Sequence, residues 1–220
     1  KLDICKEINA KDHVIYNNDD PWLRKINKKR LSAHKITFGI DRKASYTAEK
    51  IRFNMKSLSF DIGRQAFRLK TLSKENIYNA LAAVAVGRLL GISYESLRQS
   101  LGSAKFPKGR QNIYKASGFW VIDDTYNANP TSVASALMTL ARFPAKGKKF
   151  FVFGDMLELG MAAPQAHRKV GALSAENKLD FFLTYGRWSQ LSSREARTRS
   201  IKGCHCKTHE NVIQELKARI

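Results

Sequence analysis

Short apolar stretches separated by polar turns dominate the first third of the chain. They lie at 13–16, 35–40, 56–62 and 65–69, and Gly63 stands between the last two. Apolar runs of this length, bounded by turn-forming residues, are typical of β-strands. The pattern therefore predicts a meander of strands in this part of the chain.

From residue 76 onward the pattern changes to helical spacing. Apolar residues recur at intervals of three or four over 76–90, with alanines between them, which favours a helix that packs closely against a sheet. Gly91 is expected to end this helix, and Ser93 is a candidate N-cap for a second helix over 94–101. The segment 106–109, which contains a proline and a glycine, indicates a hinge or linker.

Beyond this linker, strand-like and helix-like segments alternate. Strands are predicted at 119–122, 149–153 and 181–183, and helices at 130–141 and 165–177. Such alternation indicates a parallel sheet with right-handed crossovers, and the unbroken apolar run at 119–122 is typical of a buried strand. We therefore predict an α/β fold with two domains, residues 1–111 and a Rossmann-like domain over residues 112–220.

Composition adds little to this picture. Hydrophobic residues make up 43% of the 220 residues and aromatic residues 10%, which are the proportions of a folded protein. The sequence contains no apolar run of about 18 residues, as a membrane span requires. The first residues, which do not begin with Met, lack the apolar core of a signal peptide. We predict a cytoplasmic monomer that does not insert into membranes.

The net charge of +20 is the one unusual feature of the composition. A strongly basic protein attracts phosphate-bearing partners, of which nucleic acid is the most obvious. However, the basic residues are spread along the chain in modest clusters, and no aromatic residues alternate with them to form a platform for single strands. We favour surface charge that serves solubility and suits anionic nucleotide substrates over nucleic-acid binding.

The three cysteines do not form a disulfide framework. Cys204 and Cys206 flank His205, and His209 follows, but the paired spacing of zinc sites is absent. A strand with two reduced thiols is the favoured interpretation, and it agrees with a reducing cytosol.

The segment 123–130 has the most informative chemistry. Asp123 and Asp124 end a predicted strand, a polar loop follows, and Pro130 opens a helix. In open α/β sheets, ligands bind at the carboxyl ends of strands, where the N-terminus of a helix favours anions. Taken alone, the segment fits an alternative equally well, in which Asp124 caps a turn and the asparagines supply loop geometry.

Four segments, in sequence order, resemble motifs of the Mur ligases. Residues 76–83, NIYNALAA, resemble the HNxxNALAA helix of the family, and residues 107–110, PKGR, resemble its PxGR element. Residues 123–130, DDTYNANP, resemble DDSYNANP, and residues 154–160, GDMLELG, resemble GDMxELG, with His167 following. The last two segments are similar to the branch of the family that adds D-alanyl-D-alanine, and the four together span most of the chain.

This resemblance implies a fold and a reaction. The fold would be the tail of a central ATPase domain followed by a Rossmann-like ligase domain that is incomplete at its end. With ATP and Mg²⁺, the carboxylate of a UDP-N-acetylmuramoyl-tripeptide would be phosphorylated, and the amine of D-alanyl-D-alanine would attack the acyl phosphate. A tetrahedral intermediate would collapse to the amide, as a step of peptidoglycan synthesis. Another ligase of the superfamily, such as a folylpolyglutamate synthase-like enzyme, and a basic nucleic-acid-binding module are the alternatives.

The resemblance also implies roles for individual residues. Asn79 would face the adenine, Asp124 would bind the ribose side of ATP, and Asn127 would lie near the adenine ring. Arg110 would sit beside the nucleotide and help to hold a closed, catalytic state. Lys1 stands in a segment that resembles KxEIF, whose lysine is carbamylated and reaches toward magnesium. Apart from Lys1, no metal ligand is implied within the chain.

Asp155 and Glu158 would shape a surface that faces the dipeptide, or else would cap the following loop. The chain also departs from the family pattern. Glu75 stands where the family has His, and no Gly-x-x-x-x-Gly-Lys-Ser/Thr loop for phosphates occurs in the 220 residues. The UDP-binding domain is also missing. We therefore expect this chain alone to be inactive, either as part of a longer gene product or as a relic.

Overall fold

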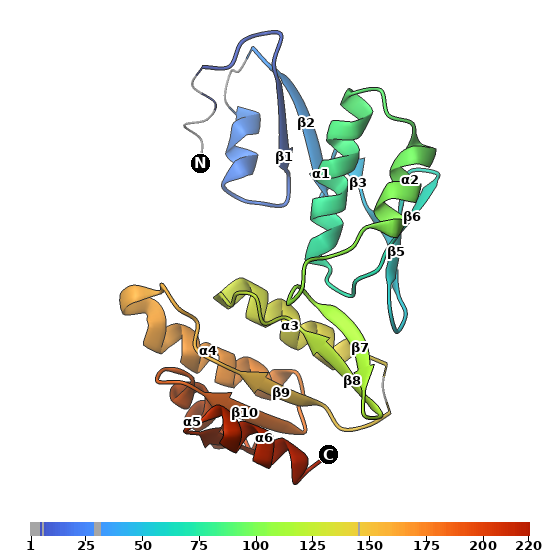
Figure 1. Cartoon of the computed structure of the whole chain (residues 1–220). Helices are drawn as coiled ribbons and strands as arrows, with labels where there is room; N and C mark the ends of the chain where they lie inside the picture. Colours follow the sequence, from blue (N-terminus) through green and yellow to red (C-terminus); the bar gives the residue numbers. More distant parts are fainter. Residues whose placement is uncertain (1–4, 6, 29–31, 145) are drawn as a thin grey trace. The chain divides into compact units, whose positions relative to one another are not determined.

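The computed structural model describes residues 5, 7–28, 32–144 and 146–220 (Figure 1). The chain divides into two compact units, Lys1–Lys105 and Phe106–Ile220, which we call unit 1 and unit 2. The segment 106–111 therefore belongs with unit 2, and the domain boundary placed after residue 111 from the sequence falls inside that unit.

Unit 1 contains two small sheets. One is parallel, in the order β1-β2-β3, with β1 (His13–Asn17), β2 (His34–Gly39) and β3 (Tyr46–Thr47). The other is antiparallel, with β4 (Glu49–Phe53), β5 (Leu58–Ile62) and β6 (Gln65–Leu69). The predicted meander is right for the stretches 56–62 and 65–69, which form the antiparallel neighbours β5 and β6. It is wrong for the stretches 13–16 and 35–40, because β1 and β2 are parallel, and β3 and β4 were not predicted. Between β1 and β2 the chain includes the 3-10 helix η2 (Leu23–Lys28), and this segment is long enough for the crossover that parallel strands need.

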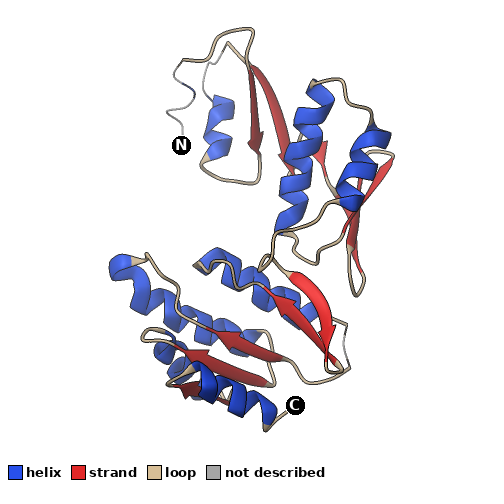
Figure 2. Ribbon diagram, in the orientation of Figure 1, coloured by secondary structure: helices blue, strands red, loops and turns tan. Residues whose placement is uncertain are grey.

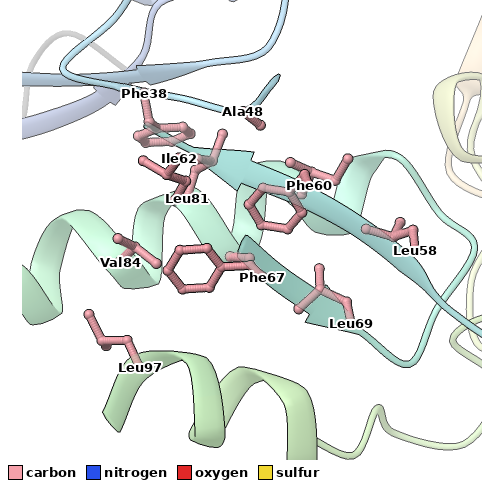
Figure 3. Close-up of a cluster of buried hydrophobic side chains, with 12 residues drawn as sticks. Phe38, Ala48, Leu58, Phe60, Ile62, Phe67, Leu69, Leu81, Val84 and Leu97 are labelled. Carbon is pink, nitrogen blue, oxygen red and sulfur yellow. The ribbon is translucent and has the colours of Figure 1, made fainter. Parts of the chain in front are cut away.

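Two helices, α1 (Glu75–Leu89) and α2 (Tyr94–Ser103), pack on these sheets, α1 mainly on β1 and β2 and α2 on β6. Ser93 caps α2 as predicted, because its Oγ accepts the backbone N–H of Ser96 at 3.1 Å. Side chains of both sheets and both helices meet in one core. Figure 3 shows Phe67 of β6 beside Val84 of α1, with Leu97 of α2 in the same cluster.

Unit 2 contains a parallel sheet in the order β11-β10-β9. Its strands are β9 (Phe150–Phe153), β10 (Phe181–Tyr185) and β11 (Gly203–Cys206). Its helices are α3 (Pro130–Arg142), α4 (Ala163–Glu176), α5 (Ser189–Thr198) and α6 (His209–Lys217), with the 3-10 helix η3 (Gly160–Ala162) before α4 (Figure 2). Because α4 joins β9 to β10 and α5 joins β10 to β11, the predicted Rossmann-like alternation is confirmed.

Both faces of this sheet are covered, as parallel sheets require. Phe153 and Phe182 pack with Val170 of α4 and Ala196 of α5. Leu183 packs on the other face in a cluster that includes α6.

The free cysteines of β11 confirm the two predicted thiols. Among the described residues, no group of three His, Cys, Asp or Glu could hold a metal ion, and no described helix is long and apolar enough to cross a membrane.

β8 (Phe119–Asp123) differs from the prediction of a buried strand in the parallel sheet. It pairs antiparallel with β7 (Asn112–Ala116), and the Phe119 side chain is 44% exposed. Ser117 and Gly118, which join the two strands, have φ of 48° and 86°, as a tight hairpin turn requires. The apolar run fits this position because Trp120 packs edge-on against Phe143.

Candidate functional site

A turn at the start of unit 2 packs against the loop that follows β8. Gly109 has φ of 71°, and its carbonyl oxygen accepts the backbone N–H of Tyr126 at 3.0 Å. A Cβ atom on Gly109 would lie 2.8 Å from the Tyr126 nitrogen, so only glycine fits without a shift of the loop. The two segments are thereby fixed to each other within unit 2.

The same turn brings Arg110 and Asp124 into one cluster. The guanidinium carbon of Arg110 lies 4.1 Å from the ring centroid of Tyr126, a cation–π contact at an exposed position. Gln111, which is buried, donates from Nε2 to Oδ2 of Asp124 at 3.4 Å. Two of the residues predicted for the nucleotide therefore share one cluster, and Gln111 and Tyr126 join it without having been predicted.

The environment of Asp124 is unusual for a loop carboxylate. Burial raises the pKa of its carboxyl group, and the hydrogen bonds from Gln111 and the positive charge of Arg110 oppose that rise. The neighbouring Asp123 has the ordinary turn role instead, since its Oδ1 accepts the backbone N–H of Thr125 at 3.2 Å and the Thr125 hydroxyl at 2.7 Å. The turn does not depend on Asp124 for these bonds.

The far end of the loop is held by a helix cap. Asn129 accepts the backbone N–H groups of Thr131 and Ser132 with its Oδ1, and the Ser132 Oγ accepts the N–H of Asn129 in return. The loop is thus anchored at Tyr126 and at Asn129. Asn127 is exposed between these two anchors.

Asn79, the predicted adenine contact, belongs to unit 1. It is exposed on α1, and its Nδ2 donates to Oδ1 of Asn76 at 3.1 Å. Asn76 in turn donates to the hydroxyl of Thr71 at 3.0 Å. This chain of bonds holds the Asn79 amide in one orientation and leaves its Oδ1 and one N–H for another partner.

Asp155 follows β9 and contacts the start of α5. Its Oδ1 accepts the backbone N–H of Ser189 at 2.7 Å, and both carboxylate oxygens accept the N–H of Trp188 at 3.0 and 3.1 Å. A Cβ on Gly186 would lie 2.5 Å from that Oδ1, so the approach needs a glycine. Asp155 therefore caps α5 from a distance in sequence, and its contact with a dipeptide stays a prediction. Glu158 is exposed on the loop that follows, with φ of 61°.

If Asp155 is a cap, its removal should lower the stability of unit 2. Asp155→Ala is expected to reduce the free energy of unfolding by about 1–2 kcal/mol, because two N–H groups at the helix start lose their acceptor. Urea denaturation measures the loss. Glu158→Ala, which removes an exposed acid nearby, is the control and should change stability by less than about 0.5 kcal/mol. Equal stability of the two variants would remove the capping role.

Lys1 lies outside the described residues. Of the other predicted site residues, Arg110, Asp124 and Asn127 share unit 2 with Asp155 and Glu158, whereas Asn79 lies in unit 1.

Two family models match the chain. The Mur ligase middle domain matches residues 1–87, and the Mur ligase, glutamate ligase domain, matches residues 109–219. The chain belongs to the Mur ligase family. Members of this family are ATP-dependent amide ligases, and the two matched domains agree with the α/β fold described above.

Individual relatives give the extent of the match. The UDP-N-acetylmuramoyl-tripeptide–D-alanyl-D-alanine ligase of Bacillus subtilis is 32% identical over 190 residues, which are 85% of this chain and 41% of the relative. A crystal structure of MurF from Acinetobacter baumannii has a TM-score of 0.87 at 30% identity, and covers 99% of this chain and 47% of that one. MurF from Thermotoga maritima, in complex with ADP, has a TM-score of 0.78 at 28% identity, with coverage of 100% and 50%. The chain spans about half the length of these relatives.

Proposed function

We propose that this chain provides part of an enzyme that joins D-alanyl-D-alanine to UDP-N-acetylmuramoyl-tripeptide with ATP, in cytoplasmic peptidoglycan synthesis. The observation that carries the nucleotide part of the proposal is the cluster of Arg110, Gln111, Asp124 and Tyr126 in unit 2. It holds a half-buried carboxylate beside an arginine at the end of a strand, immediately before the loop that leads to α3.

The acceptors of this cluster fit a ribose. Oε1 of Gln111 is buried and has no hydrogen-bond partner in the part of the chain that the structure describes. Asp124 offers carboxylate oxygens beside it, so two ribose hydroxyl groups would find two acceptors. Arg110 would lie next to the nucleotide, and Asn127 would lie near the adenine ring.

Asn79 fits the base. The Asn76 contact leaves one acceptor and one donor on the Asn79 amide, and this pair matches N6 and N7 of adenine. Mg²⁺, bound with the ATP phosphates and approached by a carbamylated Lys1, would neutralise the charge that develops on the transferred phosphoryl group.

The choice of amine rests on the segment 154–160 and on the names of the relatives. An identity of about 30% defines the family without fixing the amine substrate. Glu158, which is exposed, is the side chain of this segment that we propose for the dipeptide amine, and Asp155 would help to shape the same surface.

The decisive experiment is a ligase assay on the protein encoded by the complete reading frame. With ATP, Mg²⁺ and UDP-N-acetylmuramoyl-tripeptide, we expect ADP release that depends on D-alanyl-D-alanine, and a product whose mass increases by one dipeptide residue. The 220-residue chain alone is the control and should release no ADP, because its sequence lacks the phosphate loop.

Two other outcomes would replace the proposal. ADP release with L-glutamate and a folate, but not with the dipeptide, would favour the folylpolyglutamate synthase-type ligase. No ligase activity, together with nucleic-acid binding whose affinity falls steeply with salt, would favour the basic binding module.

A further inference from the structure

A cleft of about 410 Å³ opens on unit 1 and involves none of the residues proposed for the nucleotide. Its polar lining comes from both the antiparallel sheet and α2. The sheet contributes Arg52 of β4, Ser59 of β5 and Arg68 of β6, and α2 contributes Glu95, Arg98 and Gln99. Three of the many basic side chains of this protein therefore line one cleft.

Strand register puts the three sheet residues in a row. Arg52 is paired with Ser59, and Ser59 is paired with Arg68. Directly paired residues lie on the same face of a sheet, so the hydroxyl of Ser59 stands between two arginines. The neighbouring positions Phe60 and Phe67 have their rings on the core side (Figure 3). Because successive side chains of a strand alternate between the two faces, the packing of Phe60 and Phe67 in the core places Arg52, Ser59 and Arg68 on the opposite face of the sheet.

The three arginines have few internal partners. Arg52 reaches Asp61 only at 3.9 Å, with 61% of its side chain exposed. Arg68 uses Nε for the Ser57 hydroxyl, at 3.0 Å, and this bond leaves its two terminal nitrogens available. Arg98 is paired with Glu95 at 3.1 Å.

The lining therefore sets three guanidinium groups against one carboxylate, and the carboxylate of Asp61, outside the lining, lies 3.9 Å from Arg52. Like charges that are gathered around one cleft repel each other, and a multiply charged anion would relieve this repulsion.

We propose that this cleft binds a small ligand that carries at least two linked phosphate groups. Two N–H groups of one guanidinium can donate to two oxygens of one phosphate group. Three guanidinium groups around one cleft therefore favour a ligand that carries more than one negative charge. The volume falls within the range of about 300–1,000 Å³ that is usual for small-molecule sites. Such a ligand is either an inorganic polyphosphate or the diphosphate group of a nucleotide. The cleft shares no residue with the proposed nucleotide cluster, so either proposal can fail alone.

The test is a titration of the 220-residue chain with pyrophosphate. The side-chain Nε–H signals of Arg52, Arg68 and Arg98 are followed by NMR, and affinity is measured by calorimetry. We expect these signals to shift together with saturation. Arg52→Gln and Arg98→Gln should each weaken binding about tenfold, since each removes a charge-assisted contact. Arg64→Gln, at an exposed arginine outside the cleft, is the matched control and should leave affinity unchanged.

Titrations with UDP and citrate identify the ligand class. Tighter binding of UDP than of pyrophosphate assigns the site to a nucleotide diphosphate, and equal or weaker binding assigns it to inorganic polyphosphate. Citrate that binds as tightly as pyrophosphate would overturn the proposal, because the cleft would then select charge and not phosphate. No saturation at millimolar pyrophosphate, or equal loss of affinity in Arg64→Gln and Arg98→Gln, would also overturn it.

Discussion

His167→Ala is expected to lower the free energy of unfolding of unit 2 by about 3–4 kcal/mol. The His167 side chain has no exposed surface. Its Nε2 accepts the backbone N–H of Met156 at 3.0 Å, and its Nδ1 lies 2.7 Å from the carbonyl oxygen of Ala163. These partners assign the proton to Nδ1 and a lone pair to Nε2.

The expected loss has two physical sources. Without the ring, the N–H of Met156 stays buried with no acceptor, at a cost of about 1–3 kcal/mol. The ring also fills space beside Phe153, with centroids 5.7 Å apart, so its removal leaves a cavity in the core between the sheet and α4. Because Met156 belongs to the segment 154–160, which resembles a Mur ligase motif, the buried His167 holds the backbone of that motif through the Met156 N–H.

Urea denaturation of the chain measures the effect. Lys169→Ala changes an exposed residue of the same helix, and this control should alter stability by no more than about 0.5 kcal/mol. A loss below about 1 kcal/mol for His167→Ala would mean that a water or another group replaces the imidazole at the Met156 N–H.

The helices α1 to α4 were the most predictable part of this chain, whereas α5 and α6 were not predicted. α1, α3 and α4 follow directly from apolar spacing, and Ser93 and Pro130 mark helix starts by their own chemistry. These signals are local, since a helix makes its hydrogen bonds within one stretch of sequence. The parallel sheet β9–β11 was predictable for a similar reason, because helices alternate with its strands.

The errors occurred where a distant part of the chain decides the structure. The run at 119–122 fits a buried strand or one strand of a hairpin, and the pair Ser117-Gly118 was the signal for the hairpin. Nothing local to Asp155 indicates that it caps α5, because its partners Trp188 and Ser189 are far along the chain. Gln111, which donates to Asp124, has a left-handed backbone, with φ of 52°, and a non-glycine residue gives little signal of this conformation in the sequence.

Asp124→Asn is expected to weaken the proposed nucleotide site while it stabilises unit 2. In the protein encoded by the complete reading frame, the substitution should raise the KM for ATP or lower kcat by about tenfold or more. The reason is that a neutral amide replaces a charge-assisted acceptor for ribose hydroxyls, a bond of about 1.5–3 kcal/mol.

The stability effect follows from the pKa of Asp124, which burial raises in the folded state. A raised pKa means that the folded state favours the protonated carboxyl group. The protonated carboxyl group of Asp124 makes its full contribution to stability below the pKa that it has in the unfolded state, about 4. This contribution is lost as the pH rises through its higher pKa in the folded state. At neutral pH the ionised carboxylate therefore lowers the stability of the folded state, and asparagine, which has no charge, removes this loss. The Tm of Asp124→Asn should exceed that of the unchanged chain at pH 7, and the difference should disappear below about pH 4.

Asp123→Asn is the matched control, with the opposite expected result. Asp123 holds the turn through Thr125. Its substitution weakens charge-assisted bonds in the loop and should lower the Tm, while the KM for ATP changes less than in Asp124→Asn. Steady-state kinetics and thermal unfolding over a range of pH, on both variants, separate the roles of two adjacent acids. A lower Tm with normal kinetics for Asp124→Asn would make Asp124 a loop cap and remove it from the nucleotide site.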